Sequence, residues 1–188
     1  MNREAAEAAL FGDTLSCEET QRAAFVAQAV DATLAEALCL RAETNLHAIA
    51  VIEDTGGEED DAPLSPVLRR IEARLELMMT LLGAALRPER ADPLQPLRWS
   101  AMGARLRATG PVDEGRTGLF RIQATPWLPE PLELPAEVVA CRPDPGPDAG
   151  LWLRFAPLGE GVRSALERHL FRQHRRAIAV QRARADAP

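Results

Sequence analysis

Apolar residues recur at alternating intervals of four and three positions between residues 64 and 87. This spacing places a narrow apolar stripe along a helix, which is typical of helices that pack against other helices. Ser65 and Pro66 supply an N-cap and a first-turn proline, and Pro88 follows the stripe. The pattern predicts a self-associating helix over about 64–87, in a dimer or a tetramer. The stripe consists of Leu64, Leu68, Ile71, Leu75, Met78, Leu82 and Ala85.

The preceding segment 18–53 contains neither proline nor glycine and is rich in strong helix formers. Ser16 followed by Glu19 resembles a capping box, and Gly56 and Gly57 end the pattern. We therefore expect a long helix here, so that residues 1–88 form a helical region. Its apolar face runs through Val26, Val30, Leu34, Leu38, Leu46, Ile49 and Ile52.

After Pro88 the apolar runs shorten, and proline and glycine become frequent between them. Five or six short strands with such turns predict a small antiparallel barrel within residues 89–188. A final helix is expected over about 158–183. The fold class is therefore α+β, with long N-terminal helices, a six-stranded barrel and a C-terminal helix. The strand candidates are 97–99, 104–108, 117–124, 132–141 and 151–156.

Charge is distributed unevenly along the chain. Residues 1–66 hold 14 acids against 3 Arg, a net charge of −11, whereas residues 67–188 hold 14 acids against 19 Arg, a net charge of +5. Seven of these arginines lie on the expected final helix. The positive half is too weakly charged to make nucleic acid a favoured partner.

The sequence offers little support for membrane insertion or secretion. No apolar run approaches the ~18 residues that a membrane-spanning helix needs, and the first ten residues lack the basic start and apolar stretch of a signal peptide. Cys17, Cys39 and Cys141 form no paired motif, which fits free thiols in a reducing compartment. We expect a cytoplasmic protein without a membrane span.

Motifs for catalysis or metal binding are not apparent. The chain has no lysine, so no P-loop lysine follows Gly56-Gly57. His169 and His174 are five residues apart, which places them on different faces of a helix. We therefore expect a protein that is not an enzyme and has neither a metal site nor a cofactor.

The region 96–180 resembles a PilZ domain. Ser100-Ala-Met-Gly103 precedes a strand, the segment 131–140 is similar to the family's central strand pair, and 151–158 is similar to its last strand and helix entry. The segment 166–176 resembles the final helix of a PilZ subgroup that carries an added heptad-repeat helical region. The resemblance implies a six-stranded barrel with a C-terminal helix. Many members of the family bind cyclic di-GMP.

One of the family's two ligand motifs is altered in this chain. In the pattern Asp/Asn-x-Ser-x-x-Gly, Ser100 and Gly103 are present but Arg98 occupies the first position. An arginine cannot accept a hydrogen bond from guanine. The resemblance therefore implies weakened nucleotide recognition, with Ser100 and Gly103 retained for barrel geometry.

The other motif, Arg-x-x-x-Arg, is matched literally by Arg70 and Arg74. These residues fall inside the predicted self-associating helix over about 64–87 rather than on a loop. We therefore interpret them as part of the solvated flank of that helix. Arg87 and Arg90 lie nearer the barrel but have the wrong spacing.

The favoured hypothesis is a noncatalytic PilZ-like signalling or scaffold protein. It self-assembles through its helices, does not depend on cyclic di-GMP, and acts through contacts with an unknown protein partner. The alternative is a cyclic di-GMP receptor with a nonstandard site built from Arg87, Arg90, Arg98 and Ser100. A third interpretation, nucleic-acid binding by the arginines of the final helix, is less favoured.

Overall fold

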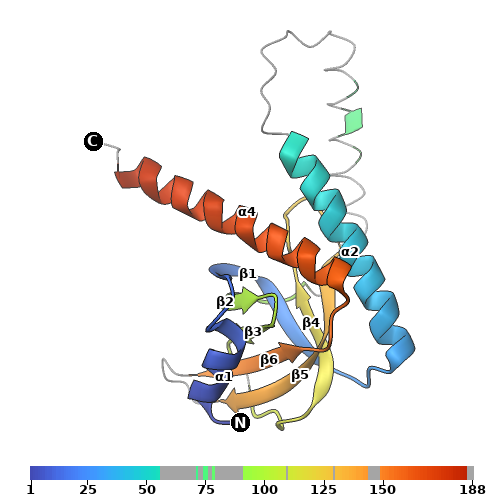
Figure 1. The fold of residues 1–188 in the computed structure, drawn as a ribbon, viewed down its shortest axis with the longest axis vertical. Helices are drawn as coiled ribbons and strands as arrows, with labels where there is room; N and C mark the ends of the chain where they lie inside the picture. The colour runs from blue at the N-terminus through green and yellow to red at the C-terminus, as the bar shows by residue number, and fades with distance from the viewer. Residues whose placement is uncertain are drawn as a thin grey trace.

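The computed structural model describes residues 1–55, 71, 74, 75, 78, 91–108, 110–128, 130–143 and 149–185. A β-barrel forms the body of the molecule, with a short N-terminal helix against its outer surface and two long helices at one end (Figure 1). The predicted α+β fold with an antiparallel barrel and a C-terminal helix is confirmed.

Six antiparallel strands close the barrel in the order β1-β2-β3-β6-β5-β4. The five strands predicted from the C-terminal half are all present, with shifted ends. In this closed order each of the six described strands has two neighbouring strands. The strands are β1 (Ser16–Ala27), β2 (Leu94–Ser100), β3 (Gly103–Leu106), β4 (Thr117–Ile122), β5 (Leu132–Arg142) and β6 (Gly150–Phe155).

The expected helix over residues 18–53 is wrong in its first part, because β1 is a strand of the barrel. Its first half, from Ser16 to Arg22, pairs with β2, and its second half, from Ala23 to Ala27, pairs with β4. Each half of β1 thus has a pairing strand for its backbone groups, and this outweighs the local helix preference of its alanines and glutamates. The barrel thus takes one strand from the segment assigned to the helical region.

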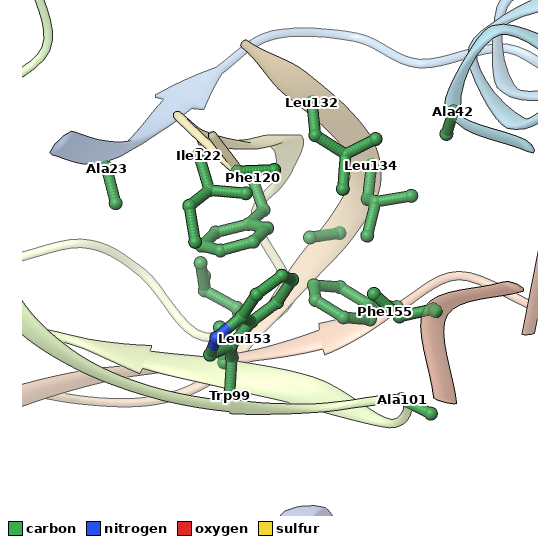
Figure 2. Close-up of a cluster of buried hydrophobic side chains, with 14 of the residues drawn as sticks. Ala23, Ala42, Trp99, Ala101, Phe120, Ile122, Leu132, Leu134, Leu153 and Phe155 are labelled. Carbon is green, nitrogen blue, oxygen red and sulfur yellow. The ribbon is translucent and has the colours of Figure 1, made fainter. Parts of the chain in front are cut away.

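Large side chains from several strands fill the barrel interior. Trp99 on β2, Phe120 on β4 and Phe155 on β6 point toward one another (Figure 2). The Trp99 and Phe120 ring centroids are 6.2 Å apart, and those of Phe120 and Phe155 are 5.4 Å apart. Both distances suit tilted aromatic packing, so the three rings hold β2, β4 and β6 together in the barrel interior.

The long helices α2 (Ala32–Thr55) and α4 (Glu160–Ala185) pack on each other, and α2 also packs on β5. Leu38, Leu46 and Ile49 of the predicted apolar face are buried, whereas Leu34 and Ile52 are exposed. On α4 the first half is anchored by Val162, Leu166 and Leu170, and the second half extends beyond the barrel (Figure 1). No helix in the described part of the chain is apolar enough over a sufficient length to cross a membrane.

Three positions of the heptad ladder lie among the described residues. Ile71, Leu75 and Met78 are helical, and their side chains are 50%, 56% and 65% exposed. Apolar side chains at this spacing, without cover from their own chain, suit contact with another helix. The other ladder positions lie outside the described residues: Leu64, Leu68, Leu82 and Ala85.

Candidate functional site

A row of side chains crosses the outer face of the barrel from β1 to β6. Glu18 on β1 lies opposite Arg98 on β2, Arg98 lies opposite Arg105 on β3, and Arg105 lies opposite Trp152 on β6. Two like charges directly opposite each other on neighbouring strands are unfavourable. The Arg98–Arg105 pair therefore creates a local demand for an anion.

Glu7 meets this demand from α1 (Arg3–Phe11), which lies across the row. Its Oε2 lies 3.4 Å from Nη1 of Arg98, and its Oε1 lies 3.4 Å from Nη1 of Arg105. Nε1 of Trp152 donates a hydrogen bond of 2.9 Å to the same Oε1. Because these side chains are largely shielded from solvent, the carboxylate offsets part of the charge of the arginine pair more effectively than an exposed one would. Glu18 adds a longer contact of 3.7 Å to Arg98.

Apolar contacts hold α1 against the same face. Asn2 caps the helix by accepting a hydrogen bond of 2.8 Å from the backbone N–H of Ala5. The guanidinium of Arg98 lies 4.5 Å from the centre of the Phe11 ring, and that of Arg105 lies 5.3 Å from the centre of the Trp152 ring. The contact forms a small apolar cluster of its own, made of Ala6, Leu10, Phe11, Val139, Ala140 and Trp152.

Ser100 and Gly103 lie beneath the C-terminal end of α1. The Ser100 hydroxyl donates a 2.7 Å hydrogen bond to the carbonyl of Leu10 and accepts one of 3.0 Å from the N–H of Met102. A Cβ on Gly103 would lie 2.1 Å from the carbonyl oxygen of Leu153 and 2.7 Å from Cδ2 of Leu10. Only glycine permits this approach of β3 to β6 and to α1.

An open groove of about 640 Å³ continues from this contact along the outside of β1, β2 and β3. Arg98, Arg105 and Arg107 belong to its lining, together with Glu18 and Glu19. Arg107 is exposed and has no ion-pair partner among the described residues. Arg107 therefore adds a third arginine to a lining that also holds two glutamates.

A second cluster of buried polar groups lies where α4 covers one end of the barrel. Trp99 Nε1 donates a 2.7 Å hydrogen bond to Glu19, whose pKa is raised by burial. Burial, followed by the charge of Glu19, raises the pKa of the Cys17 thiol to about 11. His169 is completely buried, neither of its ring nitrogens has a hydrogen-bond partner in the described part of the chain, and burial lowers its pKa to about 4. Burial therefore disfavours the charged form of each of these groups.

Lowering the pH from 7 toward 4 is expected to destabilise the protein through His169. Its pKa is about 4 when folded but 6.5 when unfolded, so in this window the unfolded chain binds a proton that the folded chain excludes. The full effect is about 3 kcal/mol. Stability is retained above pH 6.5 and is lost as the pH falls. Glu19 opposes this trend, because its raised pKa makes the folded state take up a proton more readily than the unfolded chain.

Urea denaturation between pH 7 and pH 4.5 measures this effect, with His169→Leu compared to His174→Leu. His174 is exposed on the same helix and serves as the matched control. The pH dependence should shrink only in His169→Leu. Equal slopes in the two variants would contradict the assignment.

Comparison with known proteins decides the family. The profile described as "Atypical PilZ domain, cyclic di-GMP receptor" matches residues 46–183. The chain belongs to the atypical PilZ family. The chain is 42% identical in sequence to a pathogenic protein from Xanthomonas campestris. The crystal structure of that protein is described as a new tetrameric PilZ domain self-assembled via an unusual helical bundle. The match has a TM-score of 0.79 and covers 94% of this chain and 97% of that one. No curated protein matches the sequence.

The three residues of the altered PilZ ligand motif lie together at the contact with α1, and Arg98 also lines the open groove. Arg98, Ser100 and Gly103 all contact α1 or lie directly beneath it. Arg74 is helical and exposed. The remaining arginines proposed for nucleotide binding, Arg70, Arg87 and Arg90, lie outside the described residues.

Glu7 and Trp152 belong to this candidate site and were missed by sequence reasoning. Asn2, a good N-cap, followed by the apolar positions Ala6 and Leu10, is the signal that could have located α1. Nothing in the sequence aligns Glu7 with two arginines more than 90 positions away. That alignment arises only from the pairing of β2 with β3.

Proposed function

We propose that this PilZ domain is a noncatalytic scaffold that self-assembles through its heptad helix and acts by protein contacts without binding cyclic di-GMP. The observation that carries the proposal is the cover that α1 makes over the altered ligand motif. Glu7 takes up the charge of Arg98 and Arg105, and Leu10 lies over Ser100 and Gly103. A dinucleotide would have to compete with a carboxylate of its own sign in order to reach this face.

Self-assembly is supported by the exposed ladder positions and by the related structure. Ile71, Leu75 and Met78 present apolar side chains on the segment that links α2 to the barrel. The Xanthomonas campestris protein, 42% identical over nearly the whole chain, is described as a tetramer built by a helical bundle. A similar assembly, a dimer or a tetramer, is the arrangement we propose here.

The proposed setting is the cytoplasm. Cys17, Cys39 and Cys141 are all free thiols, and free thiols persist best in a reducing compartment. The proposed lack of enzymatic activity follows the family, which is described as a receptor.

Titration of the purified protein with cyclic di-GMP by calorimetry tests the ligand part of the proposal. We expect no saturable binding at micromolar ligand, because the acceptor position of the motif is an arginine and the face is already occupied by α1. A dissociation constant in the micromolar range or tighter would overturn the proposal and favour the nonstandard receptor. In that case Arg98→Ala should abolish the binding, with the exposed Arg163→Ala as the control.

A further inference from the structure

The contact between α1 and the barrel is separate from the core that holds the barrel together. The apolar cluster under α1 contains Val139, Ala140 and Trp152 from the outer surface. The barrel interior is a different cluster, centred on Trp99 and Phe120. Loss of α1 from its position would expose the outer cluster while leaving the interior filled.

Two properties of α1 favour its displacement from the barrel face. It has nine residues, fewer than the ~12–15 at which an isolated helix becomes even marginally stable in water. Both contacts from Glu7 to the arginines are 3.4 Å, longer than the ~2.7–2.9 Å of a strong charge-assisted hydrogen bond. The helix is therefore stabilised mainly by the barrel face that it covers. The arginines of this face contact α1 less closely than a strong charge-assisted hydrogen bond would allow.

The face beneath α1 is suited to the end of a helix. Arg98 and Arg105 receive a carboxylate, Trp152 and Ala140 receive apolar side chains, and the Ser100 hydroxyl donates to a carbonyl of the last helical turn. Free carbonyls in the last turn are a property of helix C-termini. An isolated phosphate would use the arginines but would satisfy neither the apolar cluster nor this donor.

We propose that this face is a docking site for an acidic amphipathic helix of a partner protein, which takes the place of α1. The partner helix would carry the pattern that α1 shows at Glu7, Leu10 and Phe11: an acid, then apolar residues three and four positions later. A further acidic residue would reach Arg107 in the adjoining groove. This proposal rests on the proposed action through protein contacts and names the chemistry of the partner.

The groove explains how a partner could win over a helix that is already tethered. A tethered segment competes at an effective concentration in the millimolar range. The partner must therefore make contacts that α1 lacks. Arg107 and the groove of about 640 Å³ offer such contacts, because they adjoin Arg98 and Arg105 and are not covered by α1.

The test uses the full-length chain and a fluorescent peptide copy of residues 2–12 with blocked ends, followed by anisotropy. Glu7→Arg places a third cation against the arginine pair and should release α1. We expect this variant to bind the peptide at least tenfold more tightly than the wild type does. Glu4→Arg is the matched control, because Glu4 is exposed on the same helix, and it should behave as the wild type.

Glu7→Gln provides a second route to the same measurement with almost no change in side-chain size, and circular dichroism checks that each variant is folded. A scrambled peptide of the same composition should not bind to either Glu7 variant. The proposal is overturned if the folded Glu7 variants do not bind the peptide, if Glu4→Arg binds it equally, or if the scrambled peptide binds as well. None of these results depends on whether cyclic di-GMP binds, so failure here is distinguishable from failure of the calorimetric test.

Discussion

Replacing Leu75 and Met78 with aspartate is expected to break the proposed assembly into monomers. Both side chains are more than half exposed in the single chain and occupy consecutive ladder positions. Aspartates at facing seam positions would bury unpaired charge in every copy of a helical bundle. Light scattering coupled to size-exclusion chromatography should show the mass fall from that of the assembly to 20.5 kDa.

The control for this experiment is Leu94→Asp. Leu94 is 63% exposed at the start of β2 and is not one of the heptad positions, so it tests whether any loss of an exposed apolar side chain alters the mass. We expect Leu94→Asp to remain assembled. A wild-type protein that is already monomeric would contradict the proposal that the heptad positions mediate self-assembly.

Gly103→Ala is expected to destabilise the barrel by about 3 kcal/mol, at the upper end of the range for overpacking. The added Cβ would lie 2.1 Å from the backbone oxygen of Leu153, which belongs to the neighbouring strand and cannot rotate away. Separation of β3 from β6 would also disturb the seat of α1, because Leu10 contacts the same site. Urea denaturation measures the loss as a lower midpoint.

Gly159→Ala is the matched control for Gly103→Ala. A Cβ at Gly159 would meet nothing within 4 Å in the structure. Its free energy of unfolding should change by no more than about 0.5 kcal/mol. If both variants lost the same stability, the contact at Leu153 would not explain the effect, because the loss of chain entropy in the unfolded state stabilises a Gly→Ala variant.

The five C-terminal strands could be predicted because their signals are local. Short apolar runs such as 117–124 and 151–156 are bounded by glycine and proline, and these runs correspond to β4 and β6. The final helix, expected over about 158–183, is present as α4 (Glu160–Ala185). Local composition was sufficient to predict an element wherever the spacing of its apolar residues matched the face that it buries.

β1 could not be predicted in the same way. Its sequence from Ser16 to Ala27 is rich in residues that favour helices, and Ser16 with Glu19 mimics a helix start. The strands that pair with β1 are β2 and β4, which lie far along the chain. A strand that depends on such distant partners has little local signature, because β preference mostly reflects context.

The amino-acid sequence by itself determined the barrel's C-terminal strands, the final helix, the heptad ladder and the arginine that replaces the acid or amide of the PilZ motif. All of these depend on residue type and short spacing. Only the tertiary structure decided that residues 16–27 close the barrel and that Glu7 lies between Arg98 and Arg105. The reason is physical: strand register and closure bring together charges and backbone groups that are distant in the chain, and their favourable pairing outweighs local preference.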